Sequence, residues 1–110
     1  VNEVRSDSEY KIEFDVKASV ESPYSYGVII LGYDIANKET QLFSHFDIVG
    51  SEFIKKSFNF STRNDTVRIS ILLYNYESGS HTIYKDVVLK DDSGNVVKKM
   101  EKLKAIFLFL

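Results

Sequence analysis

A chain of 110 residues is long enough to bury one hydrophobic core and too short to carry a second lobe beside it, so we expect a single domain. Hydrophobic residues make up 44%, aromatic residues 14% and charged residues 27%, which is typical of a globular domain and excludes a disordered tail. The formal net charge of −2 argues against a nucleic-acid binder, and the lack of cysteine excludes a disulfide framework, a thiol nucleophile and a cysteine-ligated zinc site.

The first third of the chain predicts two strands. Residues 10–18 alternate apolar and charged side chains, and this period of two is typical of a half-buried antiparallel strand. The apolar face of that strand consists of Tyr10, Ile12, Phe14, Val16 and Ala18. After a break at Pro23, residues 26–34 are apolar on both faces, which predicts a central strand with Gly32 at a bulge or a close backbone approach.

The next two strands should lie at residues 41–49 and 53–61. In the first, alternation places Leu42, Ser44, Phe46 and Ile48 on one side and Phe43, His45 and Asp47 on the other. In the second, Phe58 and Phe60 alternate with polar residues. A polar turn at residues 62–65 then leads the chain into a long apolar run.

A hairpin is expected around the Ser-Gly-Ser sequence at residues 78–80. Residues 67–76 should place Val67, Ile69, Ile71 and Leu73 on the core face, with Arg68, Ser70, Leu72, Tyr74 and Tyr76 on the opposite face. The returning strand, residues 82–89, should direct Ile83, Val87 and Leu89 toward the core.

The C-terminal part of the chain predicts a turn and then a lysine-rich segment. Residues 92–95, Asp-Ser-Gly-Asn, fit a hairpin turn, and a short helix or an added strand should follow from Val97. We therefore expect a β-sandwich domain at residues 1–97 and a lysine-rich apolar segment at residues 98–110, which docks on the core or leads into a further segment. Its last six residues are apolar, far short of the roughly 20 that span a bilayer.

Residue types suited to catalysis or metal binding are sparse. His45 and His81 are the only histidines, and a surface or hydrogen-bonded role is the simpler interpretation for each. Asp91 and Asp92 are neighbours whose side chains point apart, and the Gly-Asn that follows favours a turn. No dinucleotide-binding, nucleophile-elbow or zinc-protease motif occurs in the sequence. We expect neither an enzyme nor a cofactor.

Tyrosine is the residue type that could form a binding surface. Its flat ring can stack on the apolar C–H face of a sugar while its hydroxyl stays in water. The candidate ligand-binding residues are Tyr74 and Tyr76, with Arg68 on the same strand face and Tyr33 or His45 contributed by neighbouring strands. The alternative interpretation is that these rings fill the core and the space between the sheets.

Four stretches, YKIEFDVKAS, VIILGYD, KKSFNFSTRNDTVRISILLYN and YKDVVL, follow one another as in the carbohydrate-binding modules of the family 4/9 type. From Tyr10 to Leu89 the chain resembles these modules, which implies a jelly-roll β-sandwich, a secreted location and glycan binding. Lys85 stands where they carry an aspartate that helps to hold a structural calcium, so calcium is disfavoured. The chain also lacks their F-E-x-G stretch and any tryptophan.

We therefore expect an all-β protein, an antiparallel β-sandwich of jelly-roll type, that acts outside the cell or at its surface as a non-catalytic carbohydrate-binding or accessory module. Its expected partners are a carbohydrate and other domains of a larger polypeptide, with membrane attachment of that polypeptide as a further option, and no nucleic acid. The alternative is a structural or protein-interaction β-sandwich of a larger surface or membrane-attached protein.

Overall fold

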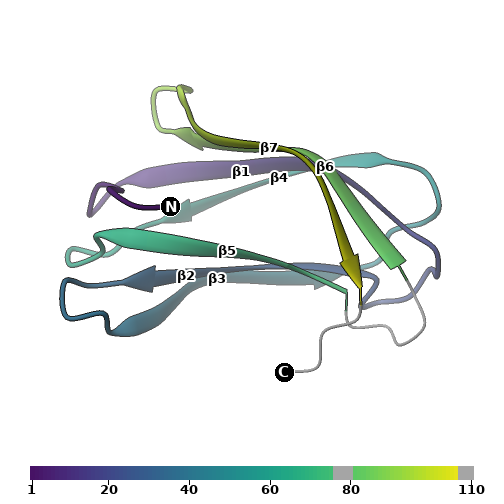
Figure 1. The fold of residues 1–110 in the computed structure, drawn as a ribbon, viewed down its shortest axis with the longest axis horizontal. Helices are drawn as coiled ribbons and strands as arrows, with labels where there is room; N and C mark the ends of the chain where they lie inside the picture. The colour runs from purple at the N-terminus through teal and green to yellow at the C-terminus, as the bar shows by residue number, and fades with distance from the viewer. Residues whose placement is uncertain (76–80, 107–110) are drawn as a thin grey trace.

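Seven antiparallel strands form two sheets that pack face to face in a computed structural model of the chain, which describes residues 1–75 and 81–106, the side chains of 101–106 excepted. The strands are β1 (Glu9–Ala18), β2 (Tyr26–Tyr33), β3 (Glu39–Asp47), β4 (Ile54–Ser61), β5 (Arg68–Tyr74), β6 (His81–Asp91) and β7 (Val96–Ile106). The order is β4-β1-β6-β7 in the upper sheet of Figure 1 and β3-β2-β5 in the lower one. No helix in the described residues is long and apolar enough to cross a membrane.

The core lies between the two sheets and follows from the alternation in the sequence. The apolar face of β1, from Tyr10 to Ala18, is at most 3% exposed. It shares one buried cluster with Val28 and Ile30 of β2 and with Ile69 of β5. Burying a large apolar side chain stabilises a fold by roughly 1.5–3 kcal/mol. The central strands β1 and β2 therefore contribute much of the stability of the sandwich.

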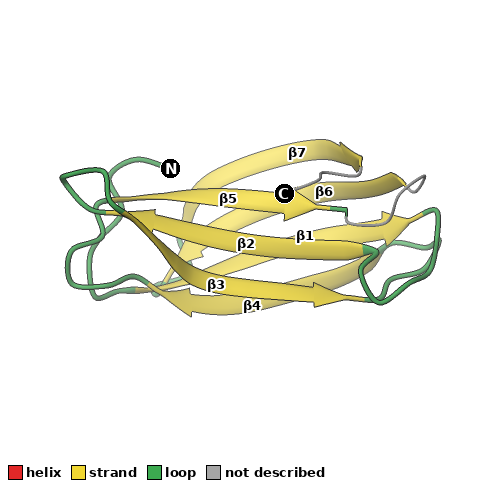
Figure 2. Ribbon diagram, turned by 90° about the horizontal axis from the view of Figure 1, so that it is seen from below, coloured by secondary structure: helices red, strands yellow, loops and turns green. Residues whose placement is uncertain are grey.

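Long-range pairing fixes the strand order. β1 pairs antiparallel with β4 and β6, and β2 pairs antiparallel with β3 and β5. The β1–β6 pair thus encloses the β2–β5 pair along the sequence, and its two strands lie in one sheet while β2 and β5 lie in the other. The predicted all-β antiparallel sandwich is confirmed, and the C-terminal segment continues as an added strand, β7, beside β6 (Figure 2).

Tyr84 of β6 links the two sheets by hydrogen bonds. Its side chain is fully buried, and its hydroxyl donates to the carbonyl oxygen of Tyr74 in β5 at 2.6 Å. The same hydroxyl accepts a hydrogen bond from the amide of Gly27 in β2 at 3.1 Å. Burial raises the pKa of the Tyr84 phenol well above its ordinary value of 10.0, so the hydroxyl keeps the proton that it donates.

The predicted core face of β6 is wrong in its first half. Simple alternation directed Ile83 inward, but the register of β6 against β1 shifts at Asp86. The φ of Asp86 is 53°, in the left-handed region, and this extra residue is a bulge that reverses the alternation. Tyr84 is consequently buried, whereas Ile83 lies on the outer face opposite Lys17.

A second bulge changes the predicted faces of β3. The register between β2 and β3 shifts so that Leu42 has no direct partner, and both Leu42 and its neighbour Phe43 pack against the core. Beyond the bulge, Phe46 pairs with Gly27 and lies on the outer face, opposite to the side that Leu42 occupies. Two consecutive side chains can face the core only because the bulge inserts a residue between two regular stretches.

Candidate ligand-binding surface

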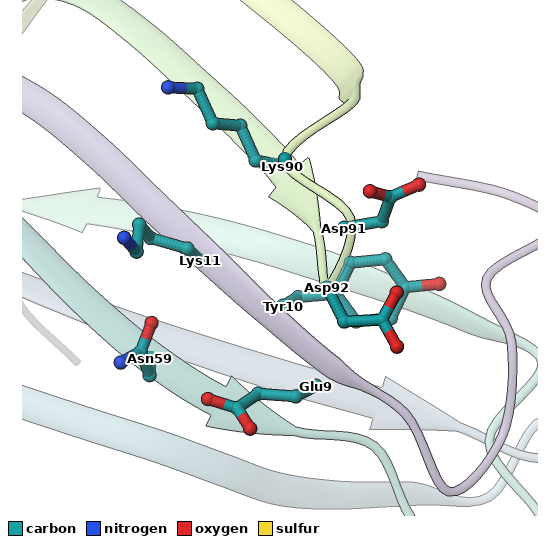
Figure 3. Close-up of a pocket in the computed structure, with 8 residues that line it drawn as sticks. Glu9, Tyr10, Lys11, Asn59, Lys90, Asp91 and Asp92 are labelled. Atoms are coloured by element: carbon teal, nitrogen blue, oxygen red, sulfur yellow. The ribbon is translucent and has the colours of Figure 1, made fainter.

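A groove of about 290 Å³ is hollowed into the outer face of the four-stranded sheet, near the turn that joins β6 to β7 (Figure 3). It is lined by Glu9, Tyr10 and Lys11 of β1, Asn59 of β4, Lys90 and Asp91 of β6, and Asp92 and Gly94 of the turn. We call this feature the polar groove. Apart from Tyr10 and Gly94, every residue that lines it carries a charge or an amide, so its surface is rich in hydrogen-bonding groups.

Strand register brings the polar side chains of the groove together. The inward face of β1 is apolar, so Glu9 and Lys11 point outward. Lys11 lies directly opposite Asn59 of β4 on one side and Lys90 of β6 on the other. Side chains that are directly opposite in a sheet have their Cβ atoms roughly 5 Å apart. Three neighbouring strands thereby present the amide of Asn59, the ammonium of Lys11 and the ammonium of Lys90 in one row, as Figure 3 shows.

The turn after β6 supplies the carboxylates at one end of the groove. The Oδ1 atom of Asp91 accepts hydrogen bonds from the amides of Ser93 at 3.0 Å and Asn95 at 2.9 Å, which closes the turn. Gly94 has a φ of 83°, a conformation that glycine adopts without steric cost. The predicted turn at residues 92–95 is confirmed, and it leaves the Asp92 side chain half exposed.

Two sets of ion pairs border the groove. Arg5 approaches Asp92 at 3.3 Å and Asp91 at 3.7 Å. On the other side, the ammonium of Lys90 lies 2.7 Å from the carboxylate of Glu13, and this hydrogen bond lowers the pKa of Glu13 below its ordinary value of 4.5. Lys11 has no ion pair among the described residues, so its ammonium is available to a ligand.

The predicted residues Arg68 and Tyr33 do come together, on the outer face of the other sheet. They are direct partners in the β2–β5 register, and the guanidinium carbon of Arg68 lies 3.9 Å from the centre of the Tyr33 ring. Arg68 also donates to the side-chain oxygen of Asn37, and the Tyr33 hydroxyl donates to Glu39 at 2.9 Å. This ring already has a cation on one face and a carboxylate on its hydroxyl.

Tyr74 occupies the far end of the same outer face. It is only 4% exposed, and its ring lies 6.4 Å from the ring of Phe46. Tyr74 is six positions along β5 from Arg68, a separation of about 20 Å in an extended strand. The two residues share a face, as predicted, without touching. Tyr76, the second predicted stacking residue, lies outside the described residues.

His45 points in the opposite direction, into the space between the sheets. Its ring lies 4.6 Å from the ring of Phe58 and 6.0 Å from that of Tyr26, and its Nε2 atom is 3.5 Å from a carboxylate oxygen of Asp47. The structure therefore does not gather the predicted residues on one surface. The polar groove was missed because its residues come from three strands whose register cannot be deduced from local alternation, although the charged face of β1 was visible in the sequence.

No protein-family model matches the chain, and no curated protein matches it. In the described part of the chain, no three histidine, aspartate or glutamate side chains gather as metal ligands. The class of protein that the structure defines is an all-β antiparallel sandwich of two sheets, with a polar groove on the outer face of the larger sheet.

Proposed function

We propose that this sandwich is a non-catalytic carbohydrate-binding or accessory module that holds a glycan in the polar groove. The observation that carries the proposal is the lining of the groove, where carboxylates, ammonium groups and an amide meet in about 290 Å³ of open space. Sugar hydroxyls both donate and accept hydrogen bonds, so a mixed lining of this kind can satisfy them.

Each lining group has a distinct part in this binding mode. The ammonium groups of Lys11 and Lys90 donate to sugar oxygens, the carboxylates of Glu9 and Asp92 accept from sugar hydroxyls, and the amide of Asn59 can do both. Binding would rest on hydrogen bonds and not on ring stacking, since the aromatic residue in the lining, Tyr10, is buried.

The resemblance to the family 4/9 carbohydrate-binding modules supports the same proposal. The positions that carry it are largely core positions, and Tyr10, Phe14 and Val16 are indeed buried in the sandwich. On this view the chain acts outside the cell or at its surface, where glycans are exposed, as one domain of a larger polypeptide that can be attached to a membrane.

A glycan array with two matched variants tests this proposal. Lys11→Gln with Asn59→Ala removes hydrogen-bond donors from the groove. Tyr33→Ala with Arg68→Ala removes the cation–aromatic pair on the other sheet. We expect the wild-type chain to bind a defined set of glycans. The groove variant should lose about tenfold or more in affinity, because each hydrogen bond to a charged group contributes roughly 1.5–3 kcal/mol.

Loss of binding in the aromatic variant alone would move the site to the three-stranded sheet. A blank array with folded wild-type protein would contradict glycan binding. Circular dichroism of each variant checks that it retains the β-sheet fold.

One observation favours the alternative, a sandwich that binds another protein. The edge of β5 that faces away from β2 is paired, among the described residues, only with the N-terminal residues. There the amide of Ile69 donates to the carbonyl of Val1 at 2.9 Å. From Ser70 to Leu73 this edge carries no charge, whereas the edge strand β4 carries Lys55 and Lys56. An uncharged edge can accept an extended strand of a partner, so a blank glycan array would direct attention to β5.

A further inference from the structure

The outer face of the four-stranded sheet carries more lysine than the acidic chain as a whole would suggest. Among the side chains that the structure describes, the outward lysines are Lys11 and Lys17 of β1, Lys55 of β4, Lys85 and Lys90 of β6, and Lys99 of β7. The described carboxylates at outward positions or at the bulge of these strands are Glu9, Glu13, Asp15 and Asp86. We call this surface the basic face. The polar groove lies at one end of it.

The register of the basic face places like charges side by side. Lys11 is directly opposite Lys90 in the β1–β6 pair, whereas Lys85 is directly opposite Asp15 in the same pair. Like charges that are directly opposite in a sheet destabilise it. Glu13 neutralises Lys90 only, at 2.7 Å. A ligand that brings negative charge to this face would remove the remaining repulsion.

An aromatic ring holds two ammonium groups at the far end of the face. Lys17 lies 4.7 Å from the centre of the Phe53 ring, and Lys85 lies 4.2 Å from it. Neither lysine has an ion pair among the described residues. We call this arrangement the Phe53 cradle. Ring contacts hold both cations in place without cancelling their charge, so the cradle can still attract an anion.

A second hollow adjoins the cradle. It measures about 250 Å³ and is lined by Lys17, Ala18, Ser19, Ser51, His81 and Ile83. Lys17 is six positions along β1 from Lys11, which corresponds to about 20 Å of extended strand. The basic face therefore has one hollow beside Lys11 and Lys90 and another beside Lys17. Because Lys11 and Lys17 are about 20 Å apart, the face can contact a ligand longer than a single sugar ring.

We propose that the ligand of this module is an acidic glycan, a chain with carboxylate or sulfate groups, that lies along the basic face from the polar groove to the Phe53 cradle. This inference rests on the proposed glycan binding and adds the charge of the ligand. The lysines pair with its anionic groups, and Glu9 and Asp92 accept from its hydroxyls. An anionic lipid surface is the alternative that the test below distinguishes.

The test compares oligosaccharides of equal length that are neutral, carboxylated or sulfated, by calorimetry at low and at physiological salt. We expect an acidic chain to bind at least about tenfold more tightly than the neutral one, since each charge-assisted contact contributes roughly 1.5–3 kcal/mol. The difference should shrink as salt rises, because exposed charges are screened. The carboxylated and sulfated arms show which anion is preferred.

Charge-matched variants locate the interaction. Lys17→Gln with Lys85→Gln should weaken the acidic chain by about tenfold and leave the neutral chain within about twofold. Lys38→Gln with Arg63→Gln makes the same change in net charge away from the basic face, at exposed positions, and should have little effect on either.

Other outcomes overturn the inference in distinguishable ways. Equal, salt-independent binding of neutral and acidic chains would overturn the acidic ligand and leave glycan binding intact. Equal loss in both variant pairs would show attraction by net charge instead of by the basic face. Binding to anionic phospholipid vesicles with no binding to any oligosaccharide would overturn both proposals in favour of a membrane surface.

Discussion

The outer faces of the two sheets differ in whether their large side chains extend into solvent or pack against the sheet. On the four-stranded sheet, lysines and carboxylates stand outward and leave the polar groove between them. On the three-stranded sheet, Phe46 lies over Gly27, beside Tyr74, and the aliphatic residues Ile29, Leu31 and Leu72 are half-buried. The Phe46 ring occupies the space that a side chain at position 27 would fill, and Tyr74 beside it is buried, so these two rings offer no exposed stacking surface. Charged residues on the same kind of face leave a groove.

Replacing Gly27 should disrupt the three-stranded face most strongly. A Cβ atom at this position would lie 2.1 Å from Cδ1 of Phe46, so the Phe46 ring would have to leave the sheet. We expect Gly27→Ala to lower the free energy of unfolding by about 1–3 kcal/mol, the range for an overpacked site. Urea denaturation followed by circular dichroism measures this.

Gly50→Ala is the matched control, because the nearest atom to its added Cβ would be 3.7 Å away, on Glu21. It should change stability by no more than about 0.5 kcal/mol. If Gly27→Ala were as mild as this control, the ring of Phe46 would not be held against the sheet, and the contrast between the two faces would disappear.

The pH dependence of stability should reveal the ion pair beside the polar groove. The hydrogen bond from Lys90 lowers the pKa of Glu13 below 4.5, so the folded state favours the ionised carboxylate. The resulting stabilisation is present above the unfolded pKa and is lost as pH falls through the lower, folded pKa. In Glu13→Gln this part of the pH dependence should be missing, and the free energies of unfolding of the two proteins should converge below pH 4.5.

Glu52→Gln serves as the control for that titration, since Glu52 is exposed and has no ion pair among the described residues. Its unfolding curve should run parallel to that of the wild type. A Glu13→Gln curve that also stayed parallel would mean that Lys90 does not stabilise the folded carboxylate.

The smallest effect is expected for the cation–aromatic pair of the three-stranded sheet. The Arg68 guanidinium lies 3.9 Å from the centre of the Tyr33 ring on a partly exposed surface. A double-mutant cycle with Arg68→Met and Tyr33→Leu should give an interaction energy of about 0.5–1 kcal/mol. An interaction energy of zero would show that the two side chains are neighbours without attraction.

Local alternation predicts regular strands well and irregular ones poorly. In β1 no residue is inserted between Tyr10 and Ala18, and its apolar face is buried as expected. In β6 the extra residue Asp86 reverses the faces, and in β3 Leu42 does the same. Neither bulged strand has a glycine or a proline at its bulge, so local alternation does not locate the extra residue. Gly32, predicted at a bulge or a close approach, lies in the partner strand β2 beside the shift in β3, and an added Cβ there would be 2.9 Å from Leu42.

The candidate site was less predictable than the fold because it depends on register between distant strands. Lys11 and Lys90 are far apart in the sequence and meet only because β1 pairs with β6. The predicted tyrosines failed to gather for the same reason, since Tyr33 and Tyr74 lie at opposite ends of the antiparallel β2–β5 pair. The chemistry of each side chain is evident from the sequence, but which strands pair, and in which register, depends on the whole fold.

The cross-sheet bond of Tyr84 gives the Gly27 amide a particular place in the dynamics of the molecule. That amide donates at 3.1 Å to a fully buried hydroxyl from the opposite sheet. Fraying at the end of β2 alone cannot bring solvent to it; the two layers must separate first. Hydrogen exchange at Gly27 therefore proceeds through the opening of the sandwich itself, and its protection factor is a direct measure of how rarely the layers part.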